Sequence, residues 1–148
     1  MASKVLDCVR RAAGSELHDD EVLLAAVRAF HVGDRGDLYA SGLPMIDSLA
    51  FAVTNERLLV FTRSALTARP KHYVDSVALD ALAVAKVTPA RFAPRLHLAF
   101  RKGVVASFEA LKSDDPLRFA GTLNEVVISR SLDCRPLVFE EELADRFG

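Results

Sequence analysis

The sequence predicts a mainly β fold, a meander of antiparallel strands closed at one end by a C-terminal helix. Apolar runs on either side of Asn55-Glu56 predict a β-hairpin over residues 46–63. Residues 95–108 alternate between apolar and polar on both sides of Lys102-Gly103, which predicts a second hairpin. Asp115-Pro116 then begins a helix, in the favoured order of a capping residue followed by proline.

Size and charge limit the class of protein. With 148 residues, the chain is long enough for one domain, 1–148, with a substantial core. Lys plus Arg total 19 against 20 for Asp plus Glu, so the near-neutral charge disfavours nucleic acid as a partner. Asp7 and Arg10 interrupt the first apolar segment, and no run reaches the ~20 apolar residues of a membrane span. We therefore expect a cytoplasmic protein.

The N-terminal part is predicted to be helical. Residues 2–13 place Val5, Leu6, Val9 and Ala13 on one stripe, with Gly14 as a stop. Because residues 58–61 are apolar on both faces of their predicted strand, that strand needs a cover on its outer side. The N-terminal helix is a candidate for this cover, and a second subunit is the alternative.

The next two segments are harder to assign. Residues 21–30 have helical apolar spacing, although their length also suits a strand, and periodicity alone favours a helix. Residues 31–45 contain three glycines and a proline among polar residues, which predicts a loop with a short extended piece at Leu38-Tyr39.

The remaining elements follow the hairpin in order. A basic loop over 64–71 precedes two predicted strands, 72–78 and 82–87. In the second hairpin we expect Leu98 and Phe100 to be buried, and His97 and Arg101 not to be. The C-terminal helix carries one apolar stripe up to about Arg130. A last amphipathic helix is predicted over 137–147, with Phe139, Leu143 and Phe147 four residues apart.

Several of these segments together resemble a known family. The Glu21-Val22-Leu23-Leu24 segment, the Thr54-Asn55-Glu56-Arg57-Leu58 hairpin, the strand 98–101 before its glycine turn, and the Asp115-Pro116 helix are similar in order and spacing to bacterial pleckstrin-homology-like domains. The resemblance covers about residues 20–130. It implies seven strands in two nearly orthogonal antiparallel sheets, with a helix closing one mouth of the barrel. It also implies that residues 21–30 form the first strand, and that the helices over 2–13 and 137–147 are additions.

The sequence holds no pattern typical of a catalytic centre. It has no Gly-x-Ser-x-Gly turn, no phosphate-binding Gly-rich loop and no His-Glu-x-x-His helix. Cys8 and Cys134 form no Cys-x-x-Cys pair, and the His18-Asp19-Asp20-Glu21 run is more typical of a capped, solvated turn than of a metal site. We therefore expect no enzyme activity, no cofactor and no metal.

Basic residues nevertheless suggest a binding surface. In a meander, the loops after the first and third strands lie at one end, and the resemblance places the last β-turn there as well. We predict a shared basic rim with these members: Arg35, Arg63, Arg69, Lys71, His72, Arg101 and Lys102. Arginine and lysine side chains suit an anionic headgroup or an acidic or phosphorylated peptide, but a solvated rim without a ligand is the favoured interpretation. The first loop offers one arginine among three aspartates, which argues against phosphoinositide binding.

These observations favour a noncatalytic interaction module that contacts a protein partner. Binding of an anionic lipid, a membrane surface or a phosphate ligand through the rim is the alternative. A small-molecule carrier or an enzyme is disfavoured, because the inward residues of the barrel are apolar.

Self-association is also expected. Hydrophobic residues make up 51% of the chain, and the two terminal helices each carry an apolar stripe, over 5–13 and 139–147. Either both helices fold back onto the barrel, or one of them meets its copy in a twofold dimer. The apolar surplus favours the homodimer.

Overall fold

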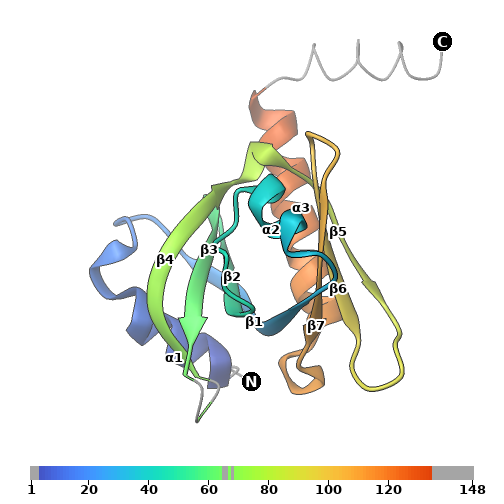
Figure 1. The fold of residues 1–148 in the computed structure, drawn as a ribbon. Coiled ribbons are helices and arrows are strands. Elements are labelled where there is room, and N and C mark those ends of the chain that lie inside the picture. The colour runs from blue at the N-terminus through green and yellow to red at the C-terminus, as the bar shows by residue number, and fades with distance from the viewer. Residues whose placement is uncertain (1–3, 65–66, 68, 135–148) are drawn as a thin grey trace, which may run out of the picture.

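The computed structural model describes residues 4–64, 67 and 69–134 (Figure 1). The strands are β1 (Leu23–Val32), β2 (Ser48–Thr54), β3 (Arg57–Arg63), β4 (Pro70–Ala78), β5 (Leu82–Thr88), β6 (Arg95–Phe100) and β7 (Val105–Ala110). The helices are α1 (Lys4–Ala13), α2 (Arg35–Ser41) and α3 (Pro116–Cys134), with 3₁₀ turns η1 (Gly14–Glu16), η2 (Leu79–Ala81) and η3 (Lys112–Asp114). The helix predicted over 137–147 lies outside the described residues.

All seven strands belong to one antiparallel sheet, in the order β4-β3-β2-β1-β7-β6-β5. Strand β1 joins the two halves, because its residues 23–30 pair with β2 and its residues 29–32 pair with β7. The two sheets expected from the resemblance are therefore continuous through β1, and Figure 1 shows the halves curving around the core. The mainly β architecture with a C-terminal helix is confirmed.

Apolar side chains fill the space between the two halves. Phe51 and Phe108 are fully buried and pack edge to face with ring centroids 5.0 Å apart, and Phe119 of α3 belongs to the same cluster. Leu98 and Phe100 are buried, whereas His97 is half-buried and Arg101 is exposed, as the alternation predicts. This packed interior argues against the small-molecule carrier alternative.

Helix α1 covers the outer face of the β1–β4 half. Its residues Val5, Val9 and Ala13 pack in a second apolar cluster with Leu59 and Phe61 of β3. The cover expected for the apolar outer face of β3 is therefore α1 of the same chain. Burial of this stripe stabilises the fold through the hydrophobic effect, in addition to the burial of side chains inside the barrel.

Two assignments made from the sequence are wrong, one from periodicity and one from glycine and proline content. Residues 23–32 form a strand, as the family resemblance implies, and not a helix. Residues 35–41 form α2, and not a loop with an extended piece at Leu38-Tyr39. The Asp34 carboxylate accepts a hydrogen bond from the Gly36 N–H at the start of α2, and Gly42 ends the helix in the left-handed region with φ 78°.

Helix α3 begins as predicted at Asp115-Pro116, where the Asp115 carboxylate accepts the Arg118 N–H at 3.3 Å. Further along α3, the Asn124 side chain bonds both backbone groups of Ala85 on β5: it accepts the N–H at 2.7 Å and donates to the C=O at 2.9 Å. Among the described residues, no helix is long and apolar enough to cross a membrane.

Candidate functional site

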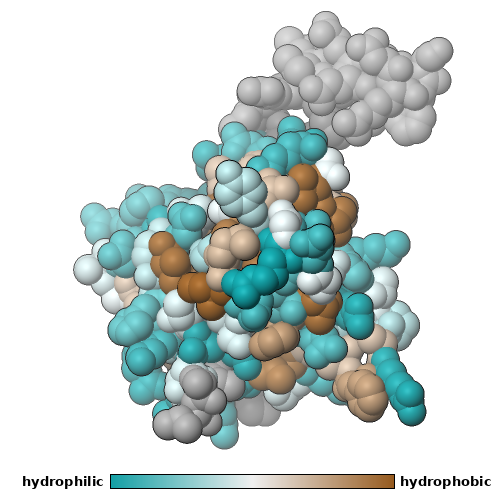
Figure 2. Space-filling view, viewed as in Figure 1, coloured by the Kyte–Doolittle hydropathy of each residue, from teal (hydrophilic) through white to brown (hydrophobic). Residues whose placement is uncertain are grey.

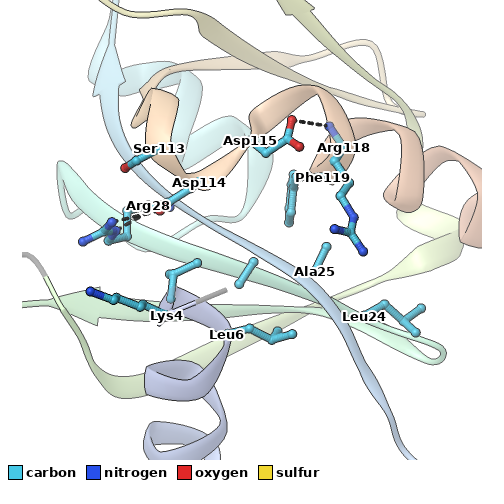
Figure 3. Close-up of a pocket in the computed structure, with 12 residues that line it drawn as sticks. Lys4, Leu6, Leu24, Ala25, Arg28, Ser113, Asp114, Asp115, Arg118 and Phe119 are labelled. Atoms are coloured by element: carbon cyan, nitrogen blue, oxygen red, sulfur yellow. Dashed lines mark hydrogen bonds and ion pairs between the residues drawn. The ribbon is translucent and has the colours of Figure 1, made fainter. Parts of the chain in front are cut away.

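A groove lies between α1 and the beginning of α3, with β1 as its floor (Figure 3). Its volume is about 470 Å³, and a second hollow of about 410 Å³ continues it around α1 toward the β3–β4 connection. The two hollows share Lys4, Val5 and Arg28. We call them together the α1 groove.

An irregularity in β1 gives the groove an apolar floor. The pairing of β1 with β2 shifts between Leu23 and Ala25, so Leu24 is the bulged residue. Its side chain is 36% exposed and lines the groove, together with Leu6 of α1 and the buried Phe119 of α3. Leu24 and the half-buried Leu6 offer apolar contact surface in this cavity, whereas Phe119 is 1% exposed and packs in the barrel core (Figure 3).

An ion pair fixes the α3 side of the groove to its floor. The Asp114 carboxylate accepts hydrogen bonds from the backbone N–H and Nε of Arg28, both at 2.9 Å, and from its Nη2 at 2.8 Å. This carboxylate raises the pKa of the Arg28 guanidinium, against an opposing effect of burial. Because Arg28 is on β1 and Asp114 comes just before α3, the pair anchors the start of that helix to the sheet.

Four other cations line the groove: Lys4, Arg11, Arg69 and Arg118. All four are exposed, and none of them pairs with a carboxylate within the described part of the chain. The Asp7 carboxylate at the rim already pairs with Arg10 at 3.1 Å. Asp115 also lines the groove, but the cations outnumber it. The α1 groove therefore combines an apolar floor with positive charge. No acidic side chain in the part of the chain that the structure describes neutralises this charge.

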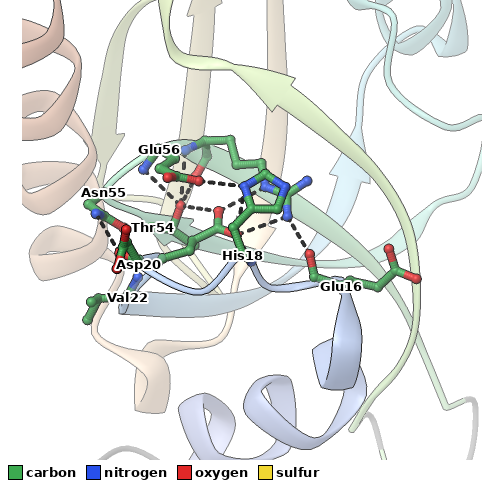
Figure 4. A network of polar contacts seen from close by, with 9 residues as sticks. Glu16, His18, Asp20, Val22, Thr54, Asn55 and Glu56 are labelled. Carbon is green, nitrogen blue, oxygen red and sulfur yellow. Dashed lines mark hydrogen bonds and ion pairs between the residues drawn. The ribbon is translucent and has the colours of Figure 1, made fainter.

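A second charged region lies at the β2–β3 turn (Figure 4). Both Glu21 oxygens accept hydrogen bonds from the Arg57 guanidinium, at 2.8 and 2.9 Å. The Thr54 hydroxyl donates to the same carboxylate at 2.7 Å and accepts the N–H groups of Glu56 and Arg57, both at 3.0 Å. Arg57, opposed by burial and assisted by the other donors, lowers the pKa of Glu21 to about 2. We call these three residues, Glu21, Thr54 and Arg57, the hairpin clasp.

His18, Glu21 and Glu56 lie close enough together beside this clasp to resemble a metal site. The His18 ring is 2.7 Å from the Glu56 carboxylate, but the Glu21 oxygens are occupied by Arg57. A cation would have to displace that guanidinium. The cluster is therefore better explained as the anchor of the β2–β3 turn.

The seven residues of the predicted basic rim do not form one site. The Arg101 N–H donates to the Ala81 carbonyl, so the β6–β7 turn with Lys102 lies beside the end of β4. Arg69 lies just before the beginning of β4, at the opposite end of that strand (Figure 1). The shared rim is thus incorrect, because strand direction separates the two turns.

The other rim residues have separate environments. Arg35 donates to the Met45 carbonyl at 2.8 Å and lies 3.7 Å from the Asp47 carboxylate. Arg63 is half-buried and donates to the Ala29 carbonyl at 2.9 Å, and burial together with nearby Arg28 lowers its pKa. Lys71 and His72 are exposed on β4. Of the seven, only Arg69 lines the α1 groove.

Solved structures with a similar fold support the architecture. A DUF1696 family protein with a pleckstrin-homology domain from Shewanella loihica matches with a TM-score of 0.52 and 21% identity, covering 82% of this chain and 92% of the other. A pleckstrin-homology domain from Shewanella amazonensis has the same TM-score with 16% identity, covering 83% and 98%. The chain has a pleckstrin-homology-like fold. The N-terminal pleckstrin-homology domain of Vps36 is also similar, with a TM-score of 0.51, 17% identity and coverage of 76% and 83%. No protein-family model and no curated protein matches the sequence.

The pleckstrin-homology-like fold accounts for the strands and α3, and the α1 groove is built where α1 meets that fold. Sequence reasoning missed Lys4, Arg11, Arg28 and Arg118 as site residues. The apolar stripe of α1 was the available signal, because residues beside a buried stripe border the surface that it covers. The contribution of α3 to the same surface had no sequence signal.

Proposed function

We propose that this chain is a noncatalytic interaction module that binds an acidic, partly apolar segment of a partner protein in the α1 groove. The observation that carries the proposal is the presence of four unneutralised cations around an apolar floor. Acidic side chains of a bound segment would pair with Lys4, Arg11, Arg69 and Arg118. Apolar side chains of the same segment would contact Leu6 and Leu24.

The shape of the site favours a peptide over a bilayer. The groove is concave, and its floor lies between two helices (Figure 3). A peptide can enter such a groove, whereas a flat lipid surface contacts the rim and leaves the floor empty. Binding of an anionic lipid or phosphate ligand is therefore the second candidate, supported by the cations alone.

Fluorescence anisotropy with a labelled peptide of alternating Glu and Leu tests the proposal. We expect Lys4→Glu, Arg69→Glu and Arg118→Glu each to weaken binding about tenfold or more, which corresponds to about 1.4 kcal/mol. Binding should also weaken as salt is added, because exposed charges are screened. Lys102→Glu is the matched control, since it makes the same charge change at the distant β6–β7 turn.

Two results would contradict the proposal. If the parent protein, diluted to a concentration at which it is monomeric, does not bind the peptide, or if Lys102→Glu weakens binding as much as the groove variants do, the α1 groove is not a peptide site. Binding to phosphatidylcholine vesicles that contain phosphatidylglycerol, without binding to the peptide, would select the lipid candidate instead.

A further inference from the structure

We propose that the acidic segment 137–147 of one copy of this chain binds in the α1 groove of a second copy, so that the protein regulates access to its own site. The inference rests on the proposed function, because it uses the same groove. It names one ligand for that groove: the chain's own C-terminal segment.

The negative charge of segment 137–147 is complementary to the positive charge of the α1 groove. Segment 137–147 contains Glu140, Glu141, Glu142 and Asp145 against a single base, Arg146. The groove presents four exposed cations that have no described acidic partner: Lys4, Arg11, Arg69 and Arg118. The opposed charges favour encounter and fix the orientation of the bound segment.

The apolar pattern of the segment also matches the groove. Phe139, Leu143 and Phe147 recur every four residues, which predicts one apolar stripe flanked by acids. The groove has apolar contact surface at Leu6 and the bulged Leu24, enclosed between two helices. A stripe of this kind laid in an apolar groove is a common way in which helical peptides are recognised.

Chain geometry favours a second copy over the same copy. Helix α3 ends at Cys134, and Phe119 at the groove lies about 22 Å back along its axis, at 1.5 Å per residue. A helix over 137–147 would be only about 16 Å long after two connecting residues. The groove also continues around α1 to the beginning of β4, which lies at the end of the molecule opposite the last turn of α3 (Figure 1). The segment of the same copy would therefore reach only the near edge of the groove.

Two copies that exchange their C-terminal segments can form a dimer with twofold symmetry. If segment 137–147 of each copy occupies the groove of the other, the two contacts are equivalent and the assembly closes as a twofold dimer. Such a dimer would occupy both grooves, and a partner's acidic segment would have to compete with it. This arrangement gives the predicted homodimer a specific contact.

Analytical ultracentrifugation of the full chain tests this inference through reversal of charge on either side. The groove variant carries Lys4→Glu, Arg69→Glu and Arg118→Glu, and the tail variant carries Glu140→Lys, Glu141→Lys and Glu142→Lys. We expect the parent to dimerise, each variant alone to raise the dissociation constant about tenfold or more, and both sets in one chain to restore dimerisation. A mixture of the two variants should form heterodimers, because it retains one intact groove and one intact tail.

Each outcome decides the inference. A parent that remains monomeric, a dimer that persists in either variant, or no recovery in the combined variant would overturn it. Circular dichroism verifies that every variant is folded, and Lys102→Glu serves as the control for a charge change outside the groove.

The proposed function is judged separately with the tail variant, whose groove is intact. If that variant binds the Glu-Leu peptide while the parent shows no dimer, only the self-recognition fails. If the peptide is not bound either, the proposed function fails as well.

Discussion

The hairpin clasp and the α1 groove are both rich in charge, but they differ in how that charge is satisfied. In the clasp, the Glu21 side chain is fully buried and accepts hydrogen bonds from Arg57, Thr54 and the His18 backbone. In the groove, Lys4 and Arg118 are exposed and have no described acidic partner. Buried charge requires such partners, whereas exposed charge remains available to a ligand.

This difference assigns separate roles to the two regions. The clasp holds the β2–β3 turn and the chain before β1 in place, because Arg57 bonds both Glu21 and the Glu16 carbonyl, so its loss should cost stability. The four exposed cations of the groove contribute little to stability, so changes to them should affect binding alone. Stability and binding measurements on matched variants can therefore separate the two.

The largest effect is expected for Arg57→Ala. The substitution leaves the Glu21 carboxylate buried without its main partner, which should cost about 3–5 kcal/mol of unfolding free energy in urea titrations. The double variant Glu21→Gln/Arg57→Ala removes the charge as well and should be more stable than Arg57→Ala alone. Equal stability of the two would show that the unpaired carboxylate is not the source of the cost.

The second-largest effect is expected when the pH is lowered, because acid protonates Glu21 and weakens the clasp. The pKa of Glu21 is about 2 in the folded protein against 4.5 for a free glutamate, so the ionised form is favoured by folding. The associated stability, about 3 kcal/mol, is present above pH ~4.5 and is lost as pH falls toward 2. Unfolding curves measured over this range should show a smaller loss for Glu21→Gln than for the parent. Identical pH profiles would contradict the assignment.

A smaller effect is expected at Thr54, whose hydroxyl organises the two-residue turn. Thr54→Val keeps the side-chain shape but removes the acceptor for two N–H groups and one donor to Glu21, which should cost about 1–3 kcal/mol. Thr54→Ser retains the hydroxyl and should lie closer to the parent. If Thr54→Ser loses more stability than Thr54→Val in thermal denaturation, the methyl packing matters more than the hydrogen bonds.

The smallest effect on stability belongs to the groove. Lys4→Ala and Arg118→Ala should each change the free energy of unfolding by no more than about 0.5 kcal/mol, because both side chains are exposed. The same variants should bind the Glu-Leu peptide more weakly. A large loss of stability in either one would mean that the groove cations support the fold, and the contrast with the clasp would disappear.

Local sequence patterns predicted most of the barrel. The second hairpin and the capped start of α3 depend on alternation, a turn and one capping residue, all within a few positions. Strand β1 misled periodicity because both of its faces are covered: Val27 faces the barrel, while Ala26 lies under α1. Apolar residues on both faces produce spacing that also fits a helix.

The residues that line the α1 groove could not be predicted from the sequence, for a different reason. Lys4, Arg28, Arg69 and Arg118 belong to four separate segments, and only the packing of α1 and α3 against β1 brings them together. The predicted rim assumed that Arg69 and Lys102 share one end of the barrel. The hydrogen bond between Arg101 and Ala81 shows that they do not. The sequence shows which residues are cationic, but the order of the strands determines which of these residues lie close together in the fold.

The contact between Asn124 and Ala85 has a consequence for how the molecule behaves among its copies. Strand β5 ends the sheet, and an exposed edge strand offers its backbone to any other extended chain. The Asn124 amide fills both hydrogen-bonding positions of Ala85, in the place that a neighbouring strand would take. One side chain of α3 thus blocks edge-to-edge pairing of strands at this point. Copies of the chain must then associate through surfaces made of side chains, where the residues present determine which partner binds.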